Sequence, residues 1–329
     1  MRHLRRIAIE EAFWLDSLST QQLADGATAS PYKAQYRSKW ARRLVDFTEY
    51  RIPEMDAHGI DLQILSLATP GVQMQPDTDV AIDDARRAND ALAAIVKEHT
   101  PRFAGLAALP LQSPEAAARE LRRAVTELGL HGALVNDHTL GHYLDERRFD
   151  VVWAELQDLG VPLYLHPTNV LPAPWPLLDG RPELDGPTFT FTVATAGHAL
   201  RLIYGGVFER FPDTTVILGH MGEFLPFWFA RLDAAHQRLD PQEHLTKLPS
   251  QYFTDNFVIT TSGVTSHAAL QAAIQTVGID NILFAVDYPF ESTAEAVAFL
   301  DTAPLADADR KKIASRNAER LLRLTGFSA

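Results

Sequence analysis

The sequence predicts an α/β fold: a single (β/α)8 barrel of the TIM type, in which eight parallel strands alternate with helices. Eight short and nearly continuous apolar runs recur along the 329 residues, and such runs are typical of strands buried on both faces of a parallel sheet. Helical patterns with clear ends separate them. No glycine-rich phosphate-binding turn follows the first run, which argues against an open, doubly wound sheet, the main alternative. We therefore expect one domain spanning residues 1–329, because a single barrel can fill that length.

The predicted strands are the eight apolar runs, namely Ile7–Ile9, Leu62–Leu67, Phe103–Leu109, Gly132–Val135, Pro162–Leu165, Val216–Leu218, Phe257–Ile259 and Ile282–Val286. The best defined of the helices between them ends at Gly129. Ser113 is a favourable N-cap for it, and Pro114 suits its first turn. Helices are also expected over Ala81–His99 and Ser266–Val277.

Two of the predicted connections are unusually long. The first runs from Trp14 to about Thr48, after strand one. The second runs from Pro167 to about Thr190, after strand five, and holds six prolines without obvious regular structure. Both would leave the barrel at its C-terminal face, where the active sites of such barrels lie. We interpret these aromatic-bearing loops as pocket walls or a lid; surface decoration or a subunit interface is the alternative.

Composition and charge exclude several classes of protein. The chain has no cysteine, which excludes disulfides, thiolate catalysis and cysteine-based metal sites. It carries 30 Lys and Arg against 42 Asp and Glu, a net charge of −12, which is not the electrostatic pattern of a nucleic-acid-binding protein. No stretch approaches the roughly 20 apolar residues of a membrane helix, and the apolar run after the N-terminus is too short for a signal peptide. We expect a soluble, cytoplasmic protein.

Polar residues stand where the predicted strands end, and in a barrel of this type such residues point into the catalytic mouth. Glu10 ends strand one, His166 ends strand five and Asp287 ends strand eight. Two carboxylates and one imidazole suit a divalent cation such as Zn²⁺ or Mn²⁺, with Mg²⁺ also compatible, and leave positions open for water and substrate. His220 ends strand six, and Glu223 follows three residues later, where it could orient that imidazole.

Each of these residues also has an ordinary structural interpretation. A single histidine is more often a hydrogen-bonded core or surface residue than a ligand, Asp287 could cap a turn, and Glu10 could belong to a structural ion pair. Their joint occurrence at strand ends favours a site. His198, on the helix after the proline-rich loop, is left open.

Several motifs resemble those of a known family, in family order and along nearly the whole chain. They are Ile9-Glu10-Glu11-Ala12-Phe13, the stretch from His58-Gly59 to Gln73, Gly132-Ala133-Leu134-Val135-Asn136-Asp137, His166-Pro167, Gly219-His220-Met221-Gly222-Glu223, Ile259-Thr260-Thr261-Ser262-Gly263 and Leu283-Phe284-Ala285-Val286-Asp287-Tyr288-Pro289-Phe290-Glu291. With these motifs the chain resembles the amidohydrolase-related metal-dependent decarboxylases, in particular the branch acting on hydroxybenzoates: 2,3-dihydroxybenzoate, γ-resorcylate (2,6-dihydroxybenzoate) and salicylate.

The resemblance implies an amidohydrolase-like barrel with one divalent metal ion, a small aromatic acid as substrate, and a homotetramer or homodimer. It places Glu10, His166 and Asp287 on the family's metal ligands, His220 on its active-site histidine and Glu223 on that residue's acidic neighbour. It also suggests Asn136 as a pocket residue and Arg231 as an arginine near the pocket and a subunit interface. Phe13 and Phe290 are candidates for the ring pocket, although ordinary core packing explains an aromatic residue equally well.

Two departures from related patterns bear on the site. Many amidohydrolases have a histidine two residues after the first ligand, on the same strand face, and here that position is Ala12. Alanine there resembles the 2,3-dihydroxybenzoate and salicylate enzymes, whereas the stretch from His198 to Leu202 resembles the γ-resorcylate enzymes, so the ring pattern stays open. No lysine ends a predicted strand, so the carbamylated lysine of binuclear sites is not expected.

The resemblance implies reversible, non-oxidative decarboxylation. Asp287 is our candidate for the acid that protonates the ring carbon bearing the carboxylate, and His220, backed by Glu223, would hold or deprotonate a ring hydroxyl. A metal-dependent hydrolase of a lactone or amide is the alternative, because the same ligands could activate water. A non-catalytic binding barrel is the second alternative, and it predicts that no metal is retained.

Overall fold

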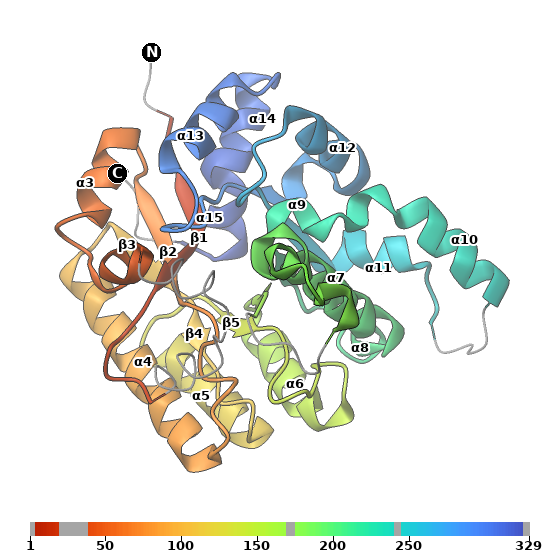
Figure 1. The fold of residues 1–329 in the computed structure, drawn as a ribbon, viewed down its shortest axis with the longest axis horizontal. Coiled ribbons are helices and arrows are strands. Elements are labelled where there is room, and N and C mark those ends of the chain that lie inside the picture. The colour runs from red at the N-terminus through yellow and green to blue at the C-terminus, as the bar shows by residue number, and fades with distance from the viewer. Residues whose placement is uncertain (1–3, 20–38, 169–174, 240–244, 325–329) are drawn as a thin grey trace.

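The fold is described from a computed structural model, which covers residues 4–19, 39–168, 175–239 and 245–324. Its strands form one parallel barrel (Figure 1). They are β1 (Ile7–Phe13), β2 (Leu62–Leu67), β3 (Phe103–Gly105), β4 (Ala107–Ala108), β5 (Ala133–Asn136), β6 (Leu163–His166), β7 (Val216–Leu218), β8 (Phe257–Thr260) and β9 (Ile282–Leu283). Neighbouring strands pair in chain order, first β1 to β3 and then β4 to β9. The predicted barrel is confirmed.

The predicted third strand, Phe103–Leu109, is interrupted. It is divided into β3 and β4 on either side of Leu106, whose backbone N–H still donates to the carbonyl of Leu65 at 2.9 Å. The two pieces therefore occupy one position in the barrel, between β2 and β5.

The barrel closes between β1 and the segment after β9, and this seam is not a regular ladder. It consists of one isolated parallel bridge, between Glu11 and Tyr288, with the Ala12 N–H donating to the Tyr288 carbonyl at 2.8 Å. The Glu11 carboxylate adds a link, because its Oε1 accepts from the Val286 N–H at 3.0 Å. Its Oε2 accepts from the side-chain amide of Gln63. Burial raises the pKa of Glu11 to about 8.

Helices surround the barrel and cover its outer face (Figure 1). They are α3 (Arg51–His58), α4 (Thr78–Glu98), α5 (Pro114–Thr126), α6 (Asp150–Leu159), α7 (Thr190–Tyr204), α8 (Val207–Arg210), α10 (Phe229–Leu239), α11 (Pro249–Asn256), α12 (His267–Val277), α13 (Thr293–Thr302), α14 (Asp307–Lys311) and α15 (Asn317–Leu321). The short segment α9 (His220–Glu223) has non-helical backbone angles and follows β7. The three helices predicted by residue range are present as α4, α5 and α12. None of the helices in the described part of the chain is both long and apolar enough to span a membrane.

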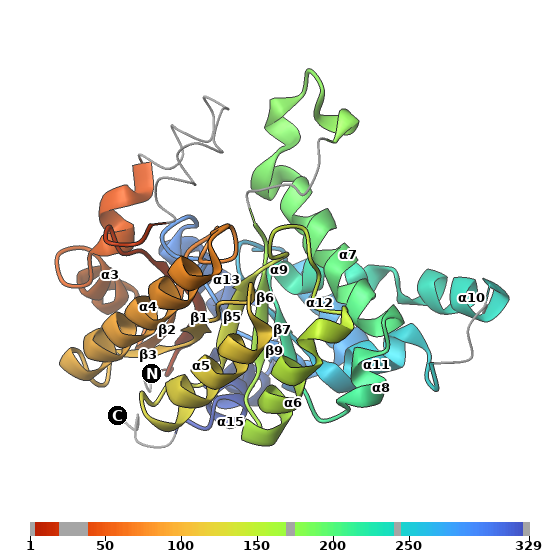
Figure 2. The same cartoon turned by 90° about the horizontal axis from the view of Figure 1, so that it is seen from below.

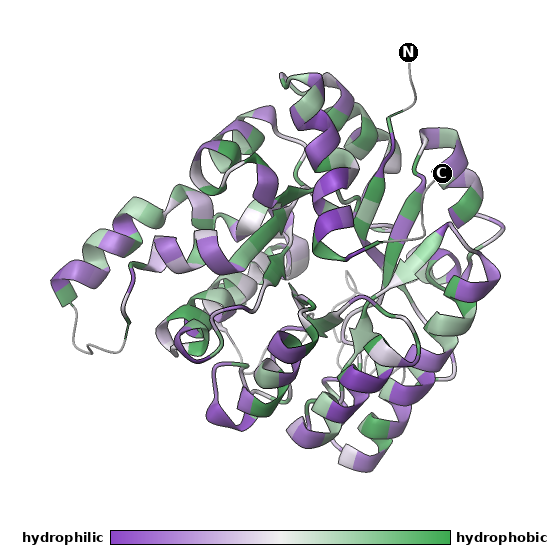
Figure 3. Ribbon diagram, turned by 180° about the vertical axis from the view of Figure 1, so that it is seen from behind, coloured by the Kyte–Doolittle hydropathy of each residue, from purple (hydrophilic) through white to green (hydrophobic). Residues whose placement is uncertain are grey.

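The core has two layers. Inside the barrel, side chains such as Ile7, Ile64 and Ile217 form one buried cluster, and a larger cluster fills the space between strands and helices. The strands are accordingly largely apolar, whereas the helices carry both apolar and hydrophilic residues (Figure 3). Because burial on both faces leaves few polar positions on the strands, a polar side chain at a strand end is informative.

The two long loops contain more regular structure than the sequence predicted. Residues 39–45 are helical in the first loop. In the second loop, one-turn 3-10 helices occupy Pro176–Leu178, Pro182–Leu184 and Gly186–Thr188. Figure 2 shows the described parts of both loops on the same side of the barrel. Trp14, predicted as part of a loop wall, is instead buried in the core. Tyr32 and Tyr36, two of the aromatic residues that the sequence places in the first long loop, lie outside the described residues.

Gly132, immediately before β5, should tolerate no side chain. Its φ is +148°, and a Cβ there would lie 2.4 Å from the Pro162 carbonyl oxygen. We expect Gly132→Ala to lower the free energy of unfolding by about 3 kcal/mol, measured by urea denaturation. Gly129→Ala is the matched control, because φ is also positive there (+71°) but no described heavy atom lies within 4 Å of the added Cβ. It should cost only about 1 kcal/mol, and equal losses would contradict the role of the close contact.

Candidate metal and active site

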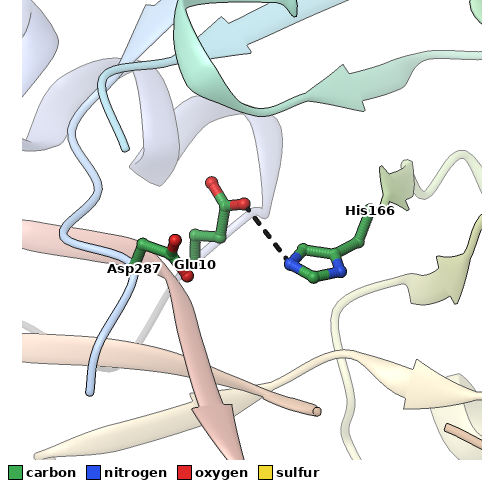
Figure 4. Close-up of side chains that lie close together, drawn as sticks. All are labelled: Glu10, His166 and Asp287. Carbon is green, nitrogen blue, oxygen red and sulfur yellow. Dashed lines mark ion pairs between the residues drawn. The ribbon is translucent and has the colours of Figure 1, made fainter. Parts of the chain in front are cut away.

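Glu10 on β1, His166 at the end of β6 and Asp287 in the segment after β9 converge at the mouth of the barrel (Figure 4). One potential ligand atom of each lies within 4.8 Å of the others. Glu10 Oε1 is 3.7 Å from His166 Nε2. The structure therefore brings together the three residues predicted as metal ligands, although they are far apart in the chain.

A bulge in β1 directs Glu10 into the mouth. Ala8 pairs with Gln63, but Glu11 pairs with Leu65, so β1 has one extra residue between these pairs. Bulges of this kind change the direction of a side chain and are common beside active sites. The Glu10 carboxylate consequently faces His166, while that of Glu11 points to the opposite side, onto Gln63 and Val286.

One oxygen of Glu10 is anchored and the other is not. Oε2 accepts hydrogen bonds from the Tyr164 hydroxyl and, at 3.1 Å, from Thr260 Oγ1. Oε1 is buried and has no hydrogen-bond partner among the described residues. A buried carboxylate oxygen without a partner is costly, and a divalent cation between Glu10, His166 and Asp287 would satisfy it. The donor set and this orphan atom fit a metal ion.

His166 is held in the tautomer that a metal ligand needs. Its Nδ1 lies 2.9 Å from Asn136 Oδ1 and 2.8 Å from the Pro167 carbonyl oxygen. Both neighbours are acceptors, so Nδ1 carries the proton and Nε2 is left facing Glu10. Burial lowers the pKa of His166, which favours the neutral imidazole. Asn136, predicted to bind substrate, thus contacts a ligand residue and is not part of the pocket lining.

His220 and Glu223 form a second unit beside the ligands. His220 Nδ1 donates to Glu223 Oε1 at 2.7 Å, and His220 Nε2 lies 3.6 Å from both Asp287 Oδ2 and Glu10 Oε1. Burial alone would lower the pKa of His220, but the carboxylates of Glu223 and Glu10 outweigh it and hold that pKa well above its usual value.

The carboxyl groups respond differently to burial. Burial raises the pKa of Asp287 to about 6, although the adjacent His220 imidazole opposes the rise. Burial also acts to raise the pKa of Glu10, but the His220 and His166 imidazoles outweigh it and leave that pKa below its usual value. Asp287 is therefore the more readily protonated of the two carboxylates at the mouth.

The segment that carries His220 and Glu223 is a strained, left-handed turn. Residues 220–224 all have positive φ values, between 49° and 78°, and Gly222 is the only glycine among them. Asp287 is left-handed as well, with φ at 73°. Each such non-glycine residue costs about 1–2 kcal/mol. Strain of this kind concentrates at functional sites, where the surrounding structure enforces it.

A recess opens to solvent beside the ligands; the empty space in and above it, part of which is open solvent, is about 250 Å³. Its lining combines the three candidate ligands with mostly apolar residues: Glu10, Ala12, Ser66, Leu67, Ala68, Thr69, Leu134, His166, Asp287 and Phe290. Phe290, predicted as a pocket aromatic, is one of them. The recess offers a charged end at the ligands and an otherwise mostly apolar lining that includes the hydroxyls of Ser66 and Thr69, which suits a small aromatic acid.

Two predicted substrate residues lie elsewhere in this chain. Phe13 points away from the mouth, because it follows Ala12 on the strand and successive side chains alternate between faces. Its buried ring packs against Phe47, with ring centroids 6.4 Å apart. Arg231 is exposed on α10 and is not part of the recess. For Phe13, core packing was the correct interpretation.

Tyr164 was not among the predicted site residues. It lies two positions before His166 on β6, so both side chains share the inner face of the barrel. This spacing of two residues before His166 is the sequence pattern that could have predicted Tyr164 as a site residue. Burial and the nearby Glu10 carboxylate raise the pKa of Tyr164 well above its usual value. The hydroxyl therefore stays protonated and donates a hydrogen bond to Glu10.

We expect Tyr164→Phe to weaken metal binding about 10–100-fold, because anchoring partners of ligands typically contribute that much. The ring is retained, so the fold should persist. Mn²⁺ affinity would be measured by competition with a chelating dye. Tyr204→Phe, which removes a hydroxyl from α7 at the outer surface, is the control. Unchanged affinity in Tyr164→Phe would show that the hydroxyl does not position Glu10.

Known proteins of the same family share this fold and length. The amidohydrolase family model matches residues 3–324. A γ-resorcylate decarboxylase from Rhizobium sp. (strain MTP-10005) is 43% identical over 329 residues, covering 98% of this chain and 99% of the relative. The chain therefore belongs to the amidohydrolase family, in the branch of the γ-resorcylate decarboxylases. The resemblance inferred from the motifs is confirmed.

Solved structures agree with this assignment. A 2,6-dihydroxybenzoate decarboxylase complexed with 2,6-dihydroxybenzoate has a TM-score of 0.89 and 42% identity, covering 97% of this chain and 99% of that one. A dihydroxybenzoic acid decarboxylase from Polaromonas sp. JS666, with bound manganese and 2-nitroresorcinol, has a TM-score of 0.88 and 42% identity, covering 97% of each chain.

Proposed function

We propose that the protein is a metal-dependent, non-oxidative decarboxylase of a hydroxybenzoate, with 2,6-dihydroxybenzoate as the first candidate substrate. The observation that carries the proposal is the convergence of Glu10, His166 and Asp287 beside an apolar recess, with His220 within 3.6 Å of both carboxylates. Full-length similarity to γ-resorcylate decarboxylases supports it, and it favours the 2,6 pattern over the 2,3 pattern that Ala12 suggested.

Glu10, His166 and Asp287 would hold one divalent ion. Bound there, the ion would offset the substrate's negative charge and favour the phenolate form of a neighbouring hydroxyl. The bound manganese of the Polaromonas structure supports Mn²⁺ as the first candidate, with Zn²⁺ and Mg²⁺ as alternatives that share these ligands.

The reaction replaces a carbon–carbon bond by a carbon–hydrogen bond. Asp287, in its protonated form, would donate a proton to the ring carbon that bears the carboxylate, forming the new C–H bond. The C–C bond then breaks, its electron pair restores the aromatic ring, and CO₂ leaves. His220, held by Glu223, would bind the ring hydroxyl, while solvent returns a proton to Asp287. One proton is consumed for each CO₂ released, and the steps are reversible.

The test is a panel of substrates. Purified protein, reconstituted separately with Mn²⁺ and Zn²⁺, would be given 2,6-dihydroxybenzoate, 2,3-dihydroxybenzoate and salicylate, and the products resorcinol, catechol and phenol would be separated by chromatography. We expect resorcinol to form fastest. No product from any of the three acids by protein with bound metal would overturn the proposal and favour hydrolysis.

We further propose that the protein forms a homo-oligomer through the region that precedes and includes α10, which extends away from the barrel (Figure 1). Phe227 and Trp228 are 61% and 47% exposed there, close in sequence to Arg231. Large exposed aromatic residues favour an interface, which would let Arg231 act at a neighbouring pocket. Light scattering after gel filtration tests this, and a monomer would refute it. A single domain over residues 1–329 and a cytoplasmic location also remain our predictions.

A further inference from the structure

Ser66 lies at the mouth of the barrel, on the same face as the inner core. Along β2, Leu62 and Ile64 belong to the cluster inside the barrel, whereas Leu65 and Leu67 belong to the outer cluster. Alternation along the strand therefore directs Ser66 inward, and Ser66 is among the residues that line the recess.

The hydroxyl of Ser66 makes no hydrogen bond to another residue in the described part of the chain and, although the residue is only 4% exposed, it is open to the recess rather than fully buried. The other hydroxyls around the site differ in this respect. Thr260 bonds to Glu10 and Ser262, and Thr69, which also lines the recess, lies 3.5 Å from the Thr168 hydroxyl. Buried hydroxyls are normally paired. A ligand in the recess would supply the partner that Ser66 lacks.

The position of Ser66 on β2 determines which part of a bound acid the Ser66 hydroxyl can contact. Its partner across the β1–β2 pair is Ala12, two residues after Glu10. Ser66 is therefore close to the level of the ligand cluster, where the acid's carboxylate would lie. The alanine methyl is small and cannot hydrogen-bond, which leaves Ser66 as the polar group on this part of the wall. With the carboxylate at the ligand cluster, a substituent next to it on the ring would come near Ser66.

We propose that Ser66 is a specificity residue that binds a second ring hydroxyl, at position 6, ortho to the carboxylate. The hydroxyl group of serine can donate and accept, so it matches a phenolic hydroxyl in either protonation state. The preferred substrate class is then 2-hydroxybenzoates with a further hydroxyl at position 6. This inference rests on the proposed function, which supplies the orientation of the acid in the recess.

A pair of acids that differ at one substituent tests the proposal. The acids are 2,6-dihydroxybenzoate and 2-hydroxy-6-methylbenzoate, in which a methyl group of similar size replaces the second hydroxyl. The wild-type protein should prefer the first acid in kcat/KM. Ser66→Ala should reduce that preference about tenfold, the effect of one hydrogen bond, by slowing the dihydroxy acid and not the methyl acid. Thr69→Val, which removes the already paired hydroxyl, should change the preference less.

Binding to the metal-loaded protein, measured by calorimetry with the same two acids, separates this proposal from the proposed function. A preference for the dihydroxy acid that Ser66→Ala removes would support the role of Ser66 even without turnover. Equal losses for both acids, or no change for either, would overturn the role of Ser66. Turnover in the same samples would still support the decarboxylase assignment. Absence of turnover with intact, Ser66-dependent binding would overturn the decarboxylase assignment alone.

Discussion

Asp287→Asn is expected to reduce decarboxylation of 2,6-dihydroxybenzoate by about 10²–10⁴-fold, the usual contribution of a positioned acid. Asparagine has nearly the shape of aspartate, but its amide cannot supply a proton to the ring carbon. Burial raises the pKa of Asp287 to about 6 in the metal-free protein, the direction that favours an acid, whereas a bound cation would lower it. Resorcinol formation in single turnover would be measured alongside metal content.

The metal measurement is needed because Asp287 also belongs to the candidate ligand cluster. A variant that retains metal and binds substrate but forms no product supports the acid role. A variant that loses the metal would instead support the role of Asp287 as a metal ligand. Activity within tenfold of the wild type would contradict both. Asp158→Asn, which alters an exposed ion pair with Arg122, is the control for a general effect of losing a carboxylate.

Removal of the metal is expected to abolish turnover and to destabilise the protein. The cluster places Glu10 and Asp287 together in a buried site, and Glu10 Oε1 has no hydrogen-bond partner among the described residues. A cation at 100 times its dissociation constant would add about 2.7 kcal/mol to the free energy of unfolding. Dialysis against a chelator should therefore lower both activity and Tm, and Mn²⁺ should restore them.

Two site variants extend the metal experiment. Tyr164→Phe should need more Mn²⁺ for the same recovery, because Glu10 loses an anchor. His166→Ala should recover little at any practical concentration. Full activity in protein that holds no detectable metal would contradict the proposed chemistry.

Strand positions and strand ends could be predicted because burial on both faces gives strands a simple pattern. Glu10, His166 and Asp287 each stand beside an apolar run, and the barrel geometry then required them to converge. The break in the third strand was not visible, since Leu106 is apolar like its neighbours and continues the pattern. The helical turns in the proline-rich loop are too short to produce a periodic signal.

The local backbone at the site could not be derived from sequence patterns. The extra residue in β1 turns Glu10 inward, yet Ile9-Glu10-Glu11 reads as an ordinary strand end with either carboxylate available. The left-handed turn at residues 220–224 is enforced by packing rather than by local preference, because four of its five residues are not glycine. Arg231 was placed near the pocket and a subunit interface by resemblance alone. Phe13 was predicted as a ring-pocket residue with core packing as the alternative, and strand alternation already directs its side chain away from the mouth.

The seam between β1 and the segment after β9 has a consequence for how the protein folds. Glu10 and Asp287 lie on opposite sides of this seam, which is joined by the Glu11–Tyr288 bridge and the hydrogen bond from the Val286 N–H to Glu11. Contacts between segments so distant in the chain carry a large loop-closure entropy, so they form late. The ion's binding site is then absent from the folding nucleus. Bound metal should accordingly slow unfolding while leaving the folding rate almost unchanged. The ion would then stabilise the barrel only after the barrel has closed.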